Sequence, residues 1–251
     1  MRLNRFFKTI GPVVAIAAVG SLAGCKNANI RINGMDGVPL AELDQSGDAP
    51  EEVALMGPDR VSITDGDRFA VTVDGDSDVT PHLRFALKDG TLGIMRDEID
   101  FTGDSVATVH VIMPPPRSLT AAGSGKITSE KLAGEAEVTI AGSGTIETPG
   151  VDATSLEVTI AGSGTYKAAG TAQSLELSVA GSGSADMAGL KVETAEINIA
   201  GSGDAIFASD GDVEASIMGS GDVTVRGSAR CKVSSVGSGT LTCEREPEPA
   251  D

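Results

Sequence analysis

The second half of the chain repeats a fixed order of apolar and small polar residues before each of seven Gly-Ser-Gly triplets. The residue three places before each triplet is always Thr, Ser or Asn. The residues four and two places before it are apolar in every repeat except the last, where Ser235 takes the second place; they are Leu119 and Ala121, Val138 and Ile140, Val158 and Ile160, Leu177 and Val179, Ile197 and Ile199, Ala215 and Ile217, and Val233. This period of two predicts a strand with one buried face.

The alternation resumes after each triplet, where the second residue is most often apolar, as at Ile127, Ile146 and Val223. Each repeat therefore supplies two short strands that meet at a Gly-Ser-Gly corner. Glycine suits such a corner because it adopts a positive φ without steric cost. The predicted turn glycines are Gly123, Gly125, Gly142, Gly144, Gly162, Gly164, Gly181, Gly183, Gly201, Gly203, Gly219, Gly221, Gly237 and Gly239.

The spacing between successive triplets is 19, 20, 19, 20, 18 and 16 residues. A period held over more than a hundred residues indicates a solenoid, and a unit this short with period-two alternation excludes helical repeats of 33 residues or more. A rung of this length buries its apolar face only by stacking on copies of itself. We therefore predict an all-β fold, a single-stranded parallel β-helix, or solenoid, with rungs of about 19 residues that are regular over 118–243.

The segment before the regular repeat carries weaker alternation. Strands are expected at 60–64, 68–73, 82–87, 91–95 and 105–113, joined by Asp-Gly turns, and we expect them to form irregular N-terminal rungs. The β-helix domain is thus assigned to 53–243. Residues 25–52 are interpreted as a tether, and the charged, proline-rich residues 244–251 as a disordered tail.

The first 24 residues read as an export signal, with Arg2, Arg5 and Lys8 followed by a short apolar stretch at 10–22. The sequence Leu22-Ala-Gly-Cys25 resembles the bacterial lipobox, which implies cleavage before Cys25 and a lipid on its thiol. The alternative is an ordinary signal peptide followed by a chance cysteine. By the same resemblance, Lys26 in place of Asp favours the outer membrane, so the expected location is the bacterial cell envelope, facing the periplasm or the cell surface.

Charge narrows the range of partners. The chain has a formal charge of −17, and removal of residues 1–24, which carry three basic and no acidic side chains, changes it to −20. Such a surface repels phosphate backbones and anionic headgroups, so we expect no nucleic-acid partner. No later apolar run approaches the roughly 20 residues of a membrane-spanning helix, so membrane attachment is assigned to the lipid.

Two further cysteines, Cys231 and Cys243, lie near the C-terminus of a chain expected to reach an oxidising compartment. Disulfides persist in such compartments. We predict a bridge between them that closes the last rung. Two separate thiols are the alternative.

The pattern apolar-Thr-apolar-Ala-Gly-Ser-Gly in register, preceded by Thr91-Leu-Gly-Ile94 and by Val109-His-Val-Ile-Met-Pro114, resembles the putative auto-transporter adhesin head GIN domain family. The resemblance covers about residues 53 to 243. It implies a β-helical fold on bacterial surface or periplasmic proteins, with no established catalytic activity.

Five glutamates recur five places before the triplets and would stack along one outward face. We call them the glutamate row: Glu137, Glu157, Glu176, Glu196 and Glu214. In water, two unit charges about 4.8 Å apart repel by roughly 0.9 kcal/mol, which a solvated face tolerates. The row is either a site for cations or a cationic partner, or a solvated face that prevents side-by-side association, and we favour the second interpretation. No metal site is assigned, and calcium is not favoured.

Catalysis finds little support in the sequence. The only histidines, His82 and His110, precede the regular repeat and are interpreted as surface strand residues. The triplet serines recur seven times, whereas a nucleophile is normally single, so they are read as turn residues. Nearly uniform rungs also lack the long loops that wall the active sites of β-helical polysaccharide-degrading enzymes, which remain the rival class.

The predicted function is therefore a non-catalytic, adhesin-like binding domain on a cell-envelope lipoprotein. It would present its acidic and hydroxyl faces to an unidentified protein or glycan. No cofactor beyond the lipid and no small-molecule substrate are expected. The alternative is a structural or regulatory module of the periplasm.

Overall fold

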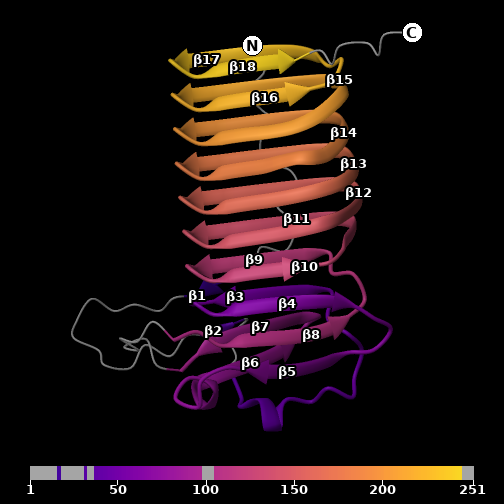
Figure 1. The fold of residues 1–251 in the computed structure, drawn as a ribbon, viewed down its shortest axis with the longest axis vertical. Helices are drawn as coiled ribbons and strands as arrows, with labels where there is room; N and C mark the ends of the chain where they lie inside the picture. The colour runs from indigo at the N-terminus through magenta and orange to yellow at the C-terminus, as the bar shows by residue number, and fades with distance from the viewer. Residues whose placement is uncertain (1–15, 18–30, 33–36, 98–104, 245–251) are drawn as a thin grey trace, which may run out of the picture.

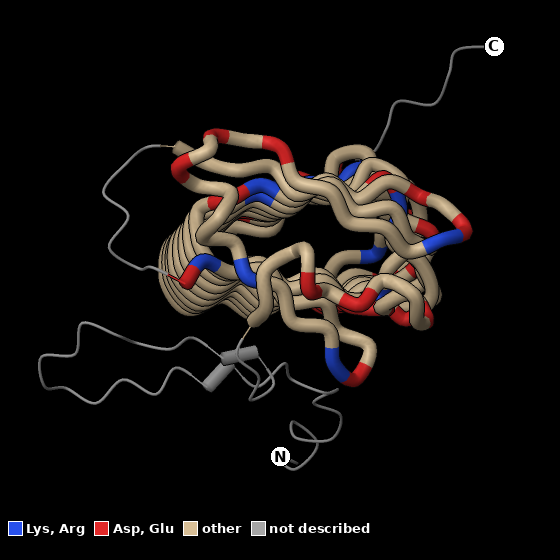
Figure 2. The backbone as a smooth tube through the Cα atoms, turned by 90° about the horizontal axis from the view of Figure 1, so that it is seen from below, with Lys and Arg blue, Asp and Glu red and all other residues tan. Residues whose placement is uncertain are grey.

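The computed structural model describes residues 16–17, 31–32, 37–97 and 105–244, and shows a parallel β-solenoid built of stacked rungs (Figure 1). Seen along its axis, the stack is a flattened ring, and charged residues occur at many positions along its circumference (Figure 2). The predicted all-β fold and its rungs of about 19 residues are confirmed. Among the described residues, no helix is long and apolar enough to cross a membrane.

Most regular rungs consist of long strands that follow the ring around, so that one strand contributes to both of its long sides, which we call its walls. Their bounds are β9 (Ser118–Gly123), β10 (Lys126–Ser129), β11 (Leu132–Gly142), β12 (Thr145–Gly162), β13 (Thr165–Gly181), β14 (Ser184–Gly201), β15 (Asp204–Gly219), β16 (Asp222–Arg226), β17 (Arg230–Gly237) and β18 (Thr240–Glu244). Equivalent positions of successive repeats pair in parallel and in register; Val158, for example, pairs with Val138 and with Leu177. The apolar positions before the triplets fill the interior, where these three side chains are fully buried.

The triplets stack at one corner of the ring. Gly181 has a φ of +123°, and a Cβ added to it would lie 2.4 Å from the carbonyl oxygen of Gly162. That same oxygen accepts a hydrogen bond of 2.9 Å from the backbone N–H of Ser182. The third glycine, Gly183, has no positive φ, but its Cβ would lie 2.8 Å from the carbonyl oxygen of Gly164. Both glycines are therefore required because the rungs approach so closely.

An additional rung precedes the seven triplets; its second strand was predicted at 60–64, whereas its first strand and its corner were not. It consists of β3 (Glu52–Met56) and β4 (Arg60–Asp65), which pair in parallel with β9 and β10. Its corner is Gly57-Pro58-Asp59, and Gly57 has a φ of +121°, close to the +119° of Gly123 stacked on it. Only the first glycine of the triplet is retained, so a search for Gly-Ser-Gly misses this corner.

The rungs do not all follow chain order. The β3–β4 rung lies between the β9–β10 rung and a rung made of β7 (Thr91–Arg96) and β8 (Thr108–Met113). The strands β5 (Ala70–Asp74) and β6 (Leu83–Lys88) then pair antiparallel with β8 and β7 and cover the N-terminal end. The expected irregular rungs are thus present, but these two strands form an antiparallel cap. The sequence did not predict this cap, because the segments of β5 and β6 show the same alternation as the other predicted strands. Whether a strand pairs in parallel or antiparallel depends on its tertiary neighbours.

Three shorter elements complete the described chain. The 3-10 helix η1 (Leu40–Glu42) precedes β3, and η2 (Thr80–His82) precedes β6. The strands β1 (Ile16–Ala17) and β2 (Arg31–Ile32) pair antiparallel. Leu40 is partly buried against the solenoid core, within the interval predicted as a tether. The predicted lipidation site Cys25, most of the predicted signal peptide and the tail residues 245–251 lie outside the described residues.

A buried ion pair joins the β7–β8 rung to the additional rung. The carboxylate of Asp59, at the corner of that rung, accepts hydrogen bonds from Arg96 Nε (2.7 Å) and Nη2 (2.5 Å) and from the backbone N–H of Ala107 (2.8 Å). Both side chains are almost fully buried. The pair fixes the relative position of the β7–β8 and β3–β4 rungs, because neither charge is tolerated in the interior without the other.

Candidate functional site

The glutamate row is continuous in the structure. Its members pair directly in register from Glu137 to Glu214, through strands β11 to β15. The row meets Lys232 at its C-terminal end, because Lys232 pairs with Glu214. At the other end Ser118 separates Glu137 from Glu52, which lies in the same line. Glu52 was missed because it belongs to the additional rung, whose corner is not a Gly-Ser-Gly triplet.

A groove of about 530 Å³ runs along the glutamate row, from β12 to β17. One side consists of Glu157, Glu176, Glu196 and Glu214, and the other of the in-register residues Ser155, Ser174, Thr194 and Asp212. Between them lie the buried side chains of Leu156, Leu175, Ala195 and Val213. We call this surface the acidic groove. It combines repeated carboxylates and hydroxyls at the rung spacing of about 4.8 Å.

Partial burial and the stacked charges raise the pKa of two carboxyls in the row. Partial burial, with the charges of Glu157 and Glu52 adding to it, raises the pKa of Glu137 above its ordinary value. Partial burial and the neighbouring charges of Glu157 and Glu196 likewise raise the pKa of Glu176. Both shifts mean that ionising Glu137 and Glu176 costs free energy in the folded chain, which a nearby cation would reduce.

The acidic groove ends at basic side chains from the last rung. Arg230 and Lys232 of β17 both line it. Arg230 forms two hydrogen bonds of 2.8 Å with the carboxylate of Asp212, and these lower the pKa of Asp212. The C-terminal end of the groove is therefore less acidic than its middle.

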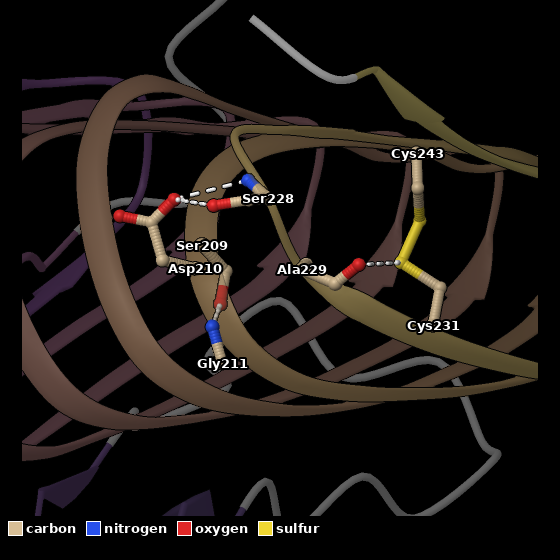
Figure 3. Close-up of a disulfide and its surroundings, with 7 residues drawn as sticks. All are labelled: Ser209, Asp210, Gly211, Ser228, Ala229, Cys231 and Cys243. Carbon is tan, nitrogen blue, oxygen red and sulfur yellow. Dashed lines mark hydrogen bonds between the residues drawn. A yellow bond between two sulfur atoms is a disulfide. The ribbon is translucent and has the colours of Figure 1, made fainter.

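The last rung also contains a disulfide between Cys231 of β17 and Cys243 of β18 (Figure 3). The two Cα atoms are 6.7 Å apart, and the bond links the two walls of the ring. Cys231 stands above the buried Val213, and Cys243 above the buried Val225. The bond thus continues the interior columns of Val213 and Val225 and joins the two walls of the final layer.

The histidines lie away from the acidic groove. His82 Nδ1 is 3.1 Å from the carboxylate of Asp97, and His110 Nε2 is 3.2 Å from that of Asp74. Both belong to the N-terminal cap and its adjoining strands. Within residues 37–97 and 105–244, no group of three or more His, Cys, Asp or Glu side chains has an arrangement that could hold a metal ion.

The serines of the triplets lie along the corner of the stack as surface turn residues. Their backbone N–H groups donate to the rung below, as from Ser163 to Gly142 and from Ser202 to Gly181. The structure therefore brings together carboxylates and hydroxyls in the groove, and leaves the histidines at the opposite end.

Comparison with known proteins gives a family and a set of similar folds. The model of the family described as putative auto-transporter adhesin, head GIN domain, matches residues 49–229. A putative adhesin from Bacteroides fragilis is similar in structure, with a TM-score of 0.69 at 20% identity, covering 78% of this chain and 92% of that one. No curated protein matches the chain.

Two further solved structures share the fold. A putative lipid binding protein from Parabacteroides distasonis has a TM-score of 0.61 at 22% identity, covering 78% of this chain and 93% of that one. A putative adhesin from Parabacteroides merdae has a TM-score of 0.57 at 19% identity, covering 78% and 92%.

Proposed function

Because the chain belongs to the putative auto-transporter adhesin head GIN domain family, we propose that it is a non-catalytic binding protein of the bacterial cell envelope, held to the membrane by lipid on Cys25. In this proposal the acidic groove is the binding surface. Its partner is a protein or glycan that presents several positive charges. The lipobox-like sequence before Cys25 supports the anchor, and the family supports the location.

The observation that carries the proposal is the repetition of carboxylates along a groove. A single exposed ion pair contributes less than about 1 kcal/mol. Four glutamates at a fixed spacing allow several such pairs to form with one extended cationic partner, and their mutual repulsion is relieved at the same time. The hydroxyls of Ser155, Ser174 and Thr194 supply neutral hydrogen-bonding groups along the opposite side of the groove.

Binding can be tested with a fluorescent oligolysine peptide as the probe. We expect the full chain to bind it, and the double variant Glu176→Gln/Glu196→Gln to bind at least tenfold more weakly. The matched control is Asp67→Asn/Asp89→Asn, which removes the same charge from exposed sites outside the groove. Equal weakening by both pairs would show a general effect of net charge and would refute the groove as the site.

The lipid anchor can be tested separately. Cells expressing the chain should incorporate labelled palmitate into it, and Cys25→Ser should abolish the label and release the protein from membranes. Labelling that persists in Cys25→Ser would contradict the anchor. Protease added to intact cells then distinguishes the two locations, because digestion supports surface adhesion and complete protection supports the alternative of a periplasmic structural or regulatory module.

The β-helical polysaccharide-degrading enzymes are the remaining alternative. We propose binding rather than catalysis, because the structure places the histidines at the opposite end from the carboxylates of the groove. A polysaccharide degradation screen tests this directly. Turnover that disappears when a single carboxylate is changed would overturn the proposal.

A further inference from the structure

The two ends of the solenoid are finished differently. At the N-terminal end the antiparallel strands β5 and β6 cover the stack, and Val38 exchanges two backbone hydrogen bonds of 2.8 Å with Phe85 of β6. At the C-terminal end, within residues 37–97 and 105–244, β17 pairs only with β15 and β18 only with β16. Their outer edges face away from the stack.

The last core layer is also incompletely covered. Val233 stands directly above Ala215 in the interior column, yet it is 53% exposed, whereas Ala215 is 1% exposed. Ser235 likewise follows the buried Ile217 and is exposed. The described chain thus ends with one apolar side chain of its core open to solvent.

The backbone at this end repeats the geometry that binds each rung to the next. The carbonyl oxygen of Gly201 accepts a hydrogen bond of 2.9 Å from Ser220 N–H, and that of Gly219 accepts one of 2.9 Å from Ser238 N–H. Gly237 has the same positive φ and the same place in the stack. No later rung follows it in the part of the chain that is described, so the edge keeps the geometry of a pairing surface.

We propose that the C-terminal rung is a docking surface for a second copy of this chain. The strands β17 and β18 run in opposite directions on opposite walls of the ring (Figure 1). A two-fold axis parallel to the strands therefore lays β17 of each copy antiparallel on β18 of the other. The open core layers, with Val233 in each, meet across the junction.

Charge favours this arrangement. The disulfide places the start of β17 next to the end of β18, so Glu244 of the second copy lies beside Arg230, with Lys232 two residues along the strand. Contact through the C-terminal rungs also keeps the acidic grooves of the two copies apart. Their separation then exceeds the electrostatic screening length of about 8 Å at physiological salt. Side-by-side contact would bring walls of a chain with charge −17 together.

The junction can be tested with the full chain purified in a mild detergent. Sedimentation velocity over a micromolar range should show a dimer. Val233→Lys should weaken the dimer at least tenfold, while Val236→Lys should leave it unchanged. Val236 is the matched control because it lies on the same strand and is 71% exposed, but pairs with the outward-facing Met218.

A second measurement identifies the contact. Mixed copies labelled with 14N and 15N are treated with a carbodiimide, which joins an amine to a neighbouring carboxylate. We expect mixed-isotope crosslinks between Lys232 and Glu244. A monomer over the whole concentration range, a dimer that Val233→Lys leaves intact, or mixed crosslinks only at other sites would overturn the proposal. Oligolysine binding by the acidic groove is independent of all three outcomes.

Discussion

Replacing Gly181 with alanine isolates the contribution of the triplet corner to stability. The new Cβ would require an L-residue to adopt a φ of +123° and would lie 2.4 Å from the carbonyl oxygen of Gly162. Holding a side chain in a glycine-only backbone region costs about 1–3 kcal/mol. Displacing the rung below also weakens the hydrogen bond from Ser182 N–H, worth about 1 kcal/mol.

We therefore expect Gly181→Ala to lower the free energy of unfolding by about 3 kcal/mol, measured by urea denaturation followed by far-ultraviolet circular dichroism. The matched control is Gly134→Ala. Gly134 has a φ of +80°, but its added Cβ would meet no atom within 4 Å, so only the backbone cost of about 1–2 kcal/mol applies. A second control, Gly47→Ala, has neither a positive φ nor a contact and should change the stability little.

The comparison separates close approach between rungs from backbone conformation. If Gly181→Ala and Gly134→Ala destabilise the chain equally, the contact with Gly162 does not matter and the reasoning is refuted. The denaturant m-value must also stay constant, because stacked repeats unfold in parts when their cooperativity fails.

Four further predictions follow from individual contacts. Glu176→Gln should raise the melting temperature at pH 7, and the gain should vanish as the pH falls below about 4.5, because a carboxyl with a raised pKa in the folded state destabilises the fold once it ionises. Millimolar calcium should leave the melting temperature of the full chain unchanged; an increase abolished by Glu176→Gln would show a cation site in the glutamate row. Replacing Cys231 and Cys243 with serine removes a link across a 12-residue separation, worth about 3 kcal/mol, and should increase hydrogen exchange in β17 and β18 while leaving β13 protected. Arg96→Leu leaves the Asp59 carboxylate buried without its cation and should destabilise the chain by about 3–5 kcal/mol in urea unfolding, whereas loss of less than 1 kcal/mol would contradict the buried pair.

The fold of the regular repeat could be predicted because each rung repeats the same alternation of apolar and polar positions. In-register apolar positions such as Val158 and Leu177 need no tertiary information beyond stacking. The glutamate row could be predicted for the same reason. Its groove could not, because the alternation of apolar and polar positions does not show that the segments from Ser155 to Glu157 and their counterparts in the next rungs enclose a hollow.

The N-terminal part escaped prediction for a different reason. Nothing local distinguishes β5, which pairs antiparallel, from β4, which pairs in parallel. The buried pair of Asp59 with Arg96 joins residues 37 positions apart that carry no shared motif. In both cases the contacts that determine the structure join residues distant in sequence, so the periodicity of the sequence does not predict them.

The insertion of the β3–β4 rung between later strands has a consequence for the order of folding. Rungs from β11 onward can form by adding each new segment to the one just completed, which needs only local loop closure. The two neighbours of β3 come later in the sequence: β7 begins about 40 residues after the start of β3, and β9 about 65 residues after it. Neither edge of β3 can pair until these segments have been synthesised. Growth of the rod in chain order is therefore possible only above β9, because the first rung in the sequence cannot pair on either side until later segments have been made.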